Sequence, residues 1–136
     1  MPQAVLDECL ADPCAPGAQA ILETSRKDGF ALIPDGAIKE LDSAYALGLG
    51  LGSGEVAVLS YALQHSQVAL VDERRARRIA QQLGVSVAGS DAILMALKKS
   101  GAVSTIRPAL LAWYRCGYFF SPALQKQLLA VAGELT

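Results

Sequence analysis

Three short, nearly continuous apolar runs stand out against longer stretches in which apolar residues recur at helical spacing. The runs cover residues 30–33, 67–71 and 85–88. Runs of this length are typical of strands that are buried on both faces of a parallel sheet. Because the runs alternate with helical patterns, the chain is predicted to form an α/β domain with a parallel sheet.

Proline, glycine and capping residues mark where the predicted helices begin and end. Proline is favoured in the first turn of a helix, and glycine just beyond its last turn. Asp35, Asp72 and Ser90 each precede a helical pattern and are expected to act as N-caps. The predicted helices run from residue 2 to before residue 13, and over residues 18–27, 35–46, 55–63, 73–83, 91–99, 108–114 and 122–133.

The composition describes one well-filled globular domain over residues 1–136. Hydrophobic residues make up 52% of the chain and charged residues 18%, which excludes a disordered chain. A domain of this length buries roughly two-thirds of its unfolded surface, so it needs no disulfide framework. The cysteines, Cys9, Cys14 and Cys116, form no Cys-x-x-Cys pair and are expected to be reduced thiols.

Neither a membrane span nor a secretory leader is expected. A span needs about 20 consecutive apolar residues, and the longest apolar runs, such as residues 92–97, are far shorter. The N-terminus lacks the basic start and apolar core of a signal peptide. The protein is therefore predicted to be soluble and cytoplasmic, with no membrane partner.

The net charge bears on nucleic-acid binding. The chain has 12 Lys and Arg residues against 13 Asp and Glu, a formal charge of −1. Domains that bind nucleic acid through their overall charge are usually strongly basic. RNA binding would therefore depend on a local basic patch, beside a site whose own carboxylates mask the total.

Acidic residues follow or begin several predicted elements. Asp72 and Glu73 come directly after the apolar run 67–71, and Glu55 begins the helix before it. Ligands of α/β sheets bind beyond the carboxyl ends of the strands, and clustered carboxylates suit hard cations such as Mg²⁺. Each residue also has a structural use: Asp72 as an N-cap, and Glu55 and Glu73 as complements to a helix dipole. Both interpretations stay open from the residues alone.

The helix after Asp72 carries four arginines within five positions. Arg74, Arg77 and Arg78 share one side of that helix, with Arg75 beside them. A guanidinium group matches a phosphate, so these side chains are candidates for contacts with a nucleic-acid backbone. The alternative is a solvated helix face, on which Glu73 pairs with Arg77 at the i, i+4 spacing.

Several catalytic classes lack their motifs here. The glycine-rich loop 48–54 is not followed by Lys-Ser or Lys-Thr, so it is not a Walker motif. The single histidine, His65, has no cysteine or histidine cluster beside it, and acid–base catalysis by histidine is unsupported. No Gly-x-Ser-x-Gly nucleophile elbow occurs.

Four segments taken in order resemble one subgroup of PIN-domain proteins, the VapC-like toxins of bacterial toxin–antitoxin modules. They combine a Gly-Glu helix start (residues 49–55), an apolar strand ending in acids before an arginine-rich helix (68–80), a Gly-Ser turn (83–90) and the helix after it (94–101). Residues 2–8 are similar to the earlier Pro-x-x-Val-x-x-Glu element of that subgroup. The resemblance therefore covers nearly the whole chain.

The resemblance implies a Mg²⁺- or Mn²⁺-dependent endoribonuclease with a three-layer α/β/α fold. Its catalytic and metal-binding acids would be Glu8, Glu55 and Asp72, with Glu73 as a further metal ligand. RNA would be the substrate, and an antitoxin protein the partner. The alternative is a catalytically impaired PIN-like module that binds or interacts without cleaving. The residues expected to contact the RNA backbone are Arg74, Arg75, Arg77 and Arg78.

Two departures from the subgroup carry expectations of their own. Asp91 stands just after the Gly-Ser turn, where the subgroup usually has an apolar residue. The family also begins with an apolar strand ending in Asp, then a helix and another strand, a β-α-β unit of about 30 residues. Nothing similar precedes Pro2. An N-terminally truncated sheet would expose an apolar edge, so we expect a homodimer in which a second copy covers that edge, and weak metal binding.

Overall fold

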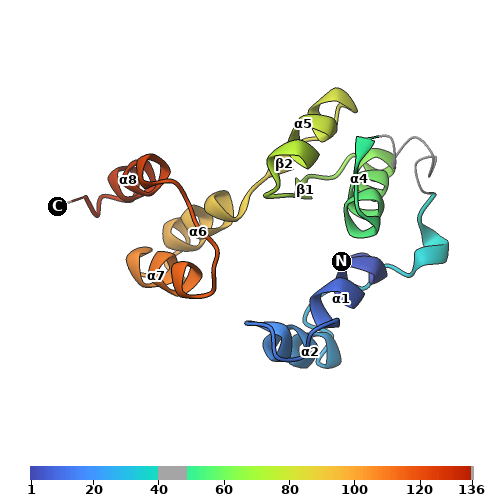
Figure 1. The fold of residues 1–136 in the computed structure, drawn as a ribbon, viewed down its shortest axis with the longest axis horizontal. Coiled ribbons are helices and arrows are strands. Elements are labelled where there is room, and N and C mark those ends of the chain that lie inside the picture. Colours follow the sequence, from blue (N-terminus) through green and yellow to red (C-terminus); the bar gives the residue numbers. More distant parts are fainter. Residues whose placement is uncertain (40–48, 136) are drawn as a thin grey trace. The chain divides into compact units, whose positions relative to one another are not determined.

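The structure is a computed structural model that describes residues 1–39 and 49–135. The contacts divide the chain into two compact units, Met1–Val87 and Ala88–Thr136, which are described separately below (Figure 1). The expectation of a single domain over the whole chain stays a prediction. No helix in the described ranges is long and apolar enough to cross a membrane.

The helices of the first unit follow the predicted pattern closely. Gly84, with φ of 77°, ends the arginine-rich helix as expected. The helix expected to begin at Asp35 is described only as a short 3₁₀ turn, and residues 40–46 of that prediction lie outside the described residues. The described elements are α1 (Gln3–Leu10), α2 (Ala18–Arg26), the turn η1 (Asp35–Ala37), α4 (Ser53–His65) and α5 (Arg74–Gln82).

The sheet is parallel and shorter than the apolar runs suggested. It consists of β1 (Ala69–Leu70) and β2 (Val87–Ala88), and the Ala69 amide donates to the Ser86 carbonyl at 2.9 Å. Mostly helical content around a short parallel sheet confirms the α/β class. Asp72 follows two residues after the carboxyl end of β1.

The strand predicted over residues 30–33 is wrong. Ile33 forms only an isolated parallel bridge with Pro2, in which the Ile33 amide donates to Met1 and the Ile33 carbonyl accepts from Gln3, both at 2.9 Å. The pairing cannot continue because α1 begins at Gln3 on one segment and η1 begins at Asp35 on the other. The apolar run therefore forms a single bridge in place of a strand.

Helix α4 is the centre of the core of the first unit. Ala57 and Leu59 are fully buried, and Val56 and Ala62 nearly so, which explains why the helix reads as apolar on several sides. Burying a leucine side chain such as Leu59 stabilises the fold by about 1.5–3 kcal/mol. The rest of this core cluster comes from the glycine loop, β1 and the residue after it, α5, and the segment before β2. Its members are Leu51, Ala69, Val71, Ala76, Ile79, Ala80 and Val85.

The second unit consists of α6 (Ser90–Lys99), α7 (Arg107–Arg115) and α8 (Pro122–Val131). Its small core is built on Leu94, Ile106 and Leu128, with Trp113 and Phe120 packed against them. The Ser121 hydroxyl accepts from the Leu124 amide at 3.2 Å and caps α8, which begins at Pro122 as predicted. Ser90, expected as a cap, is instead the first residue of α6, and Gly89 takes the N-cap position.

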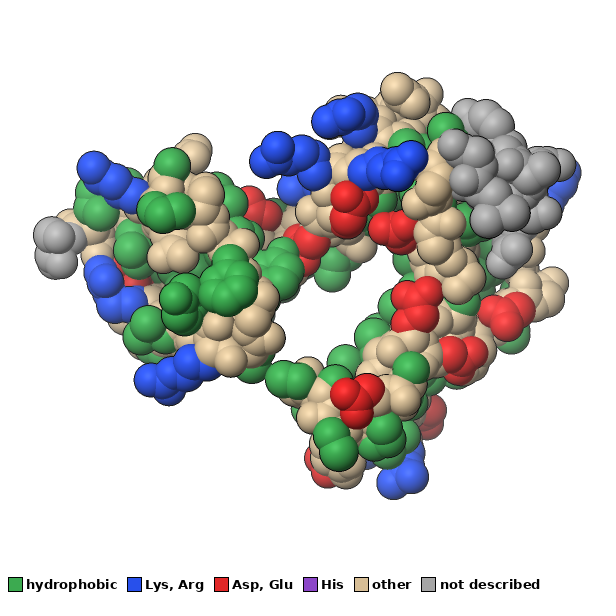
Figure 2. Space-filling model, in the orientation of Figure 1, with side chains coloured by type: hydrophobic (Ala, Val, Ile, Leu, Met, Phe, Trp, Pro, Cys, Tyr) green, Lys and Arg blue, Asp and Glu red, His purple; other side chains and the backbone are tan. Residues whose placement is uncertain are grey.

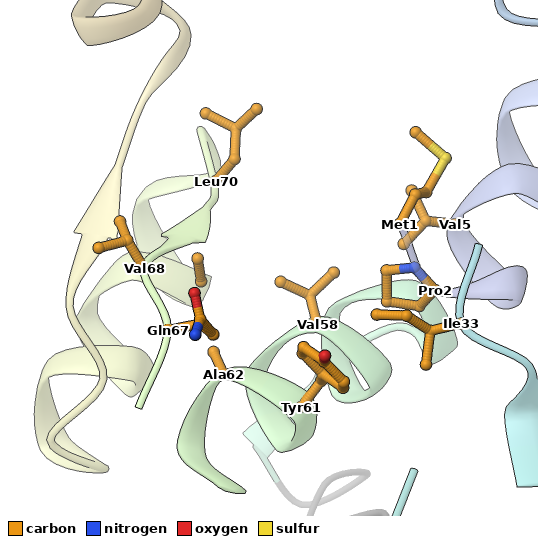
Figure 3. Close-up of a pocket in the computed structure, with 11 residues that line it drawn as sticks. Met1, Pro2, Val5, Ile33, Val58, Tyr61, Ala62, Gln67, Val68 and Leu70 are labelled. Carbon is orange, nitrogen blue, oxygen red and sulfur yellow. The ribbon is translucent and has the colours of Figure 1, made fainter. Parts of the chain in front are cut away.

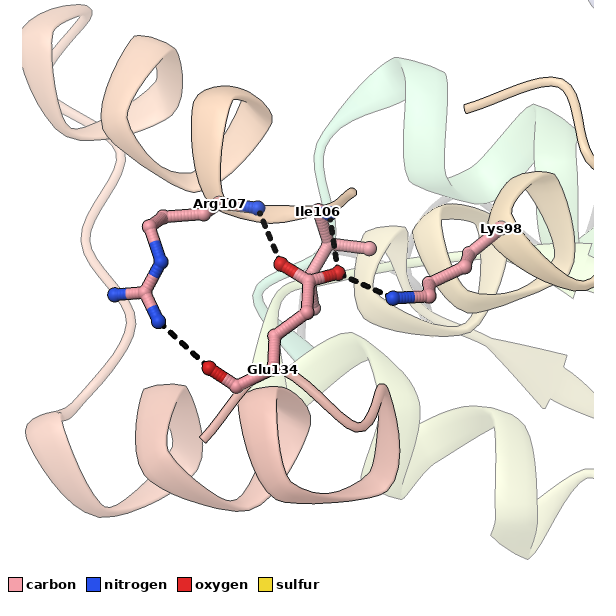
Figure 4. A network of polar contacts seen from close by, with 4 residues as sticks. All are labelled: Lys98, Ile106, Arg107 and Glu134. Atoms are coloured by element: carbon pink, nitrogen blue, oxygen red, sulfur yellow. Dashed lines mark hydrogen bonds and ion pairs between the residues drawn. The ribbon is translucent and has the colours of Figure 1, made fainter. Parts of the chain in front are cut away.

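Glu134 joins the last helix of the second unit to the start of α7 (Figure 4). Its Oε1 accepts from Lys98 Nζ at 2.5 Å and from the Ile106 amide at 2.8 Å, while Oε2 accepts from the Arg107 amide at 3.3 Å. Hydrogen bonds from Lys98, and then from the two amides, hold the pKa of Glu134 below its ordinary value. The carboxylate thus satisfies first-turn amides that a helix cannot satisfy itself.

Candidate carboxylate site

The glycine loop delivers Glu55 to the first turn of α4. Gly52 occupies the N-cap position, and its amide donates to Glu55 Oε2 at 2.9 Å, which is the reciprocal half of a capping box. The Glu55 side chain is half-buried. The glycine loop therefore works as a helix start, as predicted, and holds one carboxylate at the positive end of the helix dipole.

Glu8 reaches the same helix end from α1, which packs against α4. Its Oε1 accepts from the Gly54 amide at 2.9 Å and from the Ser53 hydroxyl at 3.2 Å. A β-carbon on residue 54 would lie 2.6 Å from Glu8 Oε2, closer than side chains tolerate. Glycine at position 54 is therefore what allows the Glu8 carboxylate to lie directly on the helix backbone.

A second glycine of the loop accommodates an arginine from α5. Gly50 has φ of 71°, and a β-carbon there would lie 2.6 Å from Arg75 Nη1 and 2.7 Å from its Cζ. The Arg75 guanidinium thus lies against the loop that leads into α4. This contact places the start of α5 beside the loop that positions Glu55.

The remaining arginines of α5 face solvent to different degrees. Arg74 and Arg78 are exposed and Arg77 is half-buried. Figure 2 shows basic side chains gathered over α5. The local basic patch that RNA binding requires is therefore present, while its contact with RNA stays a prediction.

Glu73 caps α5, a role that was expected of Asp72. Its two carboxylate oxygens accept from the amides of Arg75 at 3.0 Å and Ala76 at 2.6 Å. These amide hydrogen bonds, with Ala76 the stronger cause, lower the pKa of Glu73, and the charges of Arg75 and Arg78 add to the effect. The extended backbone of residue 73 and its longer side chain reach the first-turn amides, so the prediction of Asp72 as the cap is wrong.

The predicted acids meet only in part. Glu8 and Glu55 are both fixed at the first turn of α4. Asp72 is exposed, already has an interaction partner, and follows Val71, which shares a core cluster with Leu51 of the glycine loop. Within the described ranges, no three His, Cys, Asp or Glu side chains form a group that could hold a metal ion.

The pair Glu8–Glu55 nevertheless has donor chemistry that fits one hard cation. Mg²⁺ keeps several water ligands and is often bound by only one or two carboxylates together with substrate phosphates. In each carboxylate one oxygen accepts these hydrogen bonds: Oε1 of Glu8 from the Gly54 amide and the Ser53 hydroxyl, and Oε2 of Glu55 from the Gly52 amide. The metal-binding roles assigned to Glu8, Glu55, Asp72 and Glu73 stay predictions.

An apolar groove lies beside β1, and none of the described residues that line it is acidic (Figure 3). Its volume is about 570 Å³, and Val58 and Tyr61 of α4 form part of it. Val68, just before β1, and Leu70 within it are 64% and 56% exposed, so this segment presents apolar side chains beside the groove. The sheet described here has no strand on that side. A second copy covering this edge stays a prediction.

The first unit thus brings two carboxylates to the start of α4 and places the arginine-rich helix α5 against the same loop. The family model DUF3368, which is described as a PIN domain, matches residues 1–134, and the chain belongs to this PIN-domain family. The resemblance found in the sequence is thus confirmed at the level of the family, while the toxin subgroup stays a prediction. Searches of curated proteins and of solved structures found no match.

Proposed function

We propose that this protein is a metal-dependent endoribonuclease of the PIN type. The observation that carries the proposal is the seating of Glu8 and Glu55, from two separate helices, on the first turn of α4. Membership of the PIN-domain family supports a nuclease-type fold. RNA is the substrate class that the arginine-rich face of α5 favours, because guanidinium groups match phosphates.

In this proposal Glu8 and Glu55 would hold Mg²⁺ or Mn²⁺ together with substrate phosphates, and Asp72 and Glu73, just before α5, remain candidates for further ligands. The bound metal supplies activation of water and charge neutralisation at the leaving oxygen. Arg75 stays against Gly50 and keeps α5 in place, and the arginines at 74, 77 and 78 neutralise the phosphates that flank the scissile bond. The hydrogen bonds from Gly54 and Gly52 keep both glutamates oriented before substrate binds.

We further propose that the protein is the toxin of a toxin–antitoxin module and that an antitoxin protein inhibits it. We also propose that two copies associate along the edge of β1. The exposed Val68 and Leu70 support self-association, because an unpaired apolar strand edge invites pairing with another chain. Sedimentation velocity tests this part: a dimer that Leu70→Lys converts to a monomer supports it, and a wild-type monomer contradicts it.

The decisive experiment replaces Glu55 by Gln. Glutamine at this position still accepts from the Gly52 amide, so the capping box survives while the charge is lost. We expect Mg²⁺- or Mn²⁺-dependent cleavage of a single-stranded RNA to fall at least 100-fold at unchanged melting temperature. The matched control is Glu23→Gln on α2, a carboxylate outside the site. Full activity of Glu55→Gln, or equal loss of activity and stability, contradicts the catalytic role.

A second function is favoured by one observation. The described residues hold no three-ligand metal group, which suits a PIN relative that binds RNA without cleaving it. RNA binding by the wild-type chain, with no cleavage in either Mg²⁺ or Mn²⁺, would select this alternative.

A further inference from the structure

The two units of the chain carry net charges of opposite sign, which add up to the formal charge of −1. Residues 88–136 contain five Lys and Arg against two Asp and Glu, a net charge of +3, whereas residues 1–87 contain seven against eleven, a net charge of −4. One of the two acids of the second unit, Glu134, is already paired with Lys98. The second unit is therefore a basic module, which the total charge of the chain did not reveal.

Helix α7 of this unit exposes a stripe of basic, apolar and aromatic residues. Arg107, Leu111, Tyr114 and Arg115 recur at i, i+4, i+7 and i+8, the spacing that places side chains on one helix face. Leu111 is 54% exposed and Tyr114 58% exposed, although both are large apolar side chains. The face of α7 that they form does not contribute to the core of the unit.

The stripe continues into the loop after α7 through Phe119. Phe119 is 63% exposed and packs edge-to-face on Tyr114, with ring centroids 4.9 Å apart. Trp113 and Phe120 form a similar pair at 5.5 Å, but they pack against the core. Core packing thus explains one aromatic pair and leaves the Tyr114–Phe119 pair, which we call the exposed pair, without a structural use.

A pocket of about 280 Å³ adjoins the exposed pair. Tyr114, Arg107 and Gln125 line it together with three leucines at positions 110, 111 and 129. Arg107 Nη2 donates to the Glu134 carbonyl at 2.7 Å, which fixes the guanidinium while most of its five donors remain for other partners. The leucines give the pocket an apolar floor for a base, and the aromatic ring, guanidinium and amide at its rim are groups that contact a nucleobase and its phosphate.

We propose that the exposed pair and its flanking arginines bind single-stranded nucleic acid, with bases stacked on Tyr114 and Phe119 and phosphates on Arg107 and Arg115. Stacking on aromatic rings beside a positively charged surface is how proteins hold single strands without reading sequence. The charge of +3 favours a polyanion over an apolar protein surface as the occupant. The choice of RNA as the single strand rests on the proposed function, whereas the binding itself does not require cleavage.

The test measures binding of the full chain to a fluorescein-labelled oligouridylate of about 12 nucleotides by anisotropy, in EDTA so that no metal-dependent cleavage occurs. Tyr114→Ala with Phe119→Ala should weaken binding by about 5- to 150-fold for each base that loses its stack. Tyr114→Phe keeps the ring and should bind as the wild type does. Arg115→Gln should weaken binding modestly and reduce its salt dependence.

The outcomes separate this inference from the proposed nuclease. Glu55→Gln should bind the oligonucleotide normally even though it does not cleave, so loss of cleavage alone leaves the inference intact. Unchanged affinity of the double aromatic variant, or no binding by the wild type, overturns it, and the stripe would then be a surface for a protein partner. If the double variant unfolds by circular dichroism, Arg115→Gln decides: unchanged affinity and salt dependence overturn the inference.

Discussion

Each of the two units uses a glutamate from a distant part of the chain to satisfy the first-turn amides of a helix. In the first unit Glu8 accepts from Gly54, 46 residues away, and in the second Glu134 accepts from Ile106, 28 residues away. The difference is the counter-charge. Glu134 forms an ion pair with Lys98, and the Glu134 side chain is only 11% exposed. Glu8 is exposed and is bonded by an amide and a hydroxyl.

This comparison indicates which carboxylate is structural and which is available for chemistry. The charge of Glu134 is balanced inside its own unit, so it has little attraction left for a cation from solution. The charge of Glu8 is oriented by neutral donors, which fix the carboxylate without cancelling its charge. A carboxylate held in this way is suited to bind a cation, in line with the proposed role of Glu8.

The largest effects are expected where the two cores are most tightly packed. Leu59 and Ile106 are both fully buried, one in each unit. Leu59→Ala and Ile106→Ala should each lower the free energy of unfolding by about 2–5 kcal/mol, because each leaves a cavity. Urea unfolding followed by far-UV circular dichroism measures the loss. Leu63→Ala, in α4 but 43% exposed, is the matched control and should cost less than about 1 kcal/mol. Equal losses at Leu59 and Leu63 would contradict the description of this core.

A smaller effect, confined to activity, is expected at the seat of Glu8. Gly54→Ala places a β-carbon 2.6 Å from Glu8 Oε2 and should displace the carboxylate. Alanine also raises helix propensity by about 1 kcal/mol, so the stability should change little while cleavage falls about tenfold or more. Gly52→Ala is the control, because a β-carbon there meets its nearest atom, Glu55 Oε2, at an ordinary 3.8 Å. Wild-type activity in Gly54→Ala would show that the seat of Glu8 has no role in cleavage.

The smallest expected effect is a pH dependence of the melting temperature, which should differ between variants of Glu134 and of Glu8. The pKa of Glu134 is below its ordinary value of 4.5 in the folded state, so the folded protein binds fewer protons there than the unfolded chain. Its contribution to stability is present above pH 4.5 and is lost as the pH falls through the lower, folded pKa. Glu134→Gln should therefore lower the melting temperature, read from Trp113 fluorescence, at pH 7 more than at pH 3.

The matched change at Glu8 completes the comparison. Glu8→Gln keeps an oxygen for the Gly54 amide, so it should lose metal-dependent cleavage with little change in melting temperature at either pH. High salt should weaken the effect of Glu134→Gln, since part of that interaction is the ion pair with Lys98. A destabilisation by Glu134→Gln that is the same at pH 3 and pH 7 would contradict the role given to the ion pair.

The elements that could be read from the sequence are those set by neighbouring residues. Glycines predicted where helices end, Pro122 predicted where α8 begins, and the spacing of apolar residues predicted α4. Each of these signals depends on residues within a turn or two of one another. The family was recognised for a related reason, since several short motifs recur in order and a family model matches residues 1–134.

Other features depend on residues that meet only in the folded chain. Residues 30–33 have the composition of a strand, but a strand needs an extended partner, and the segment that pairs with Ile33 becomes helix α1 at Gln3. No spacing in the sequence shows that the Gly54 amide donates to Glu8 or that Gly50 lies against Arg75. The same is true of the hydrogen bond from the Ile106 amide to Glu134. These contacts join residues far apart along the chain, and packing sets their geometry where local preference cannot.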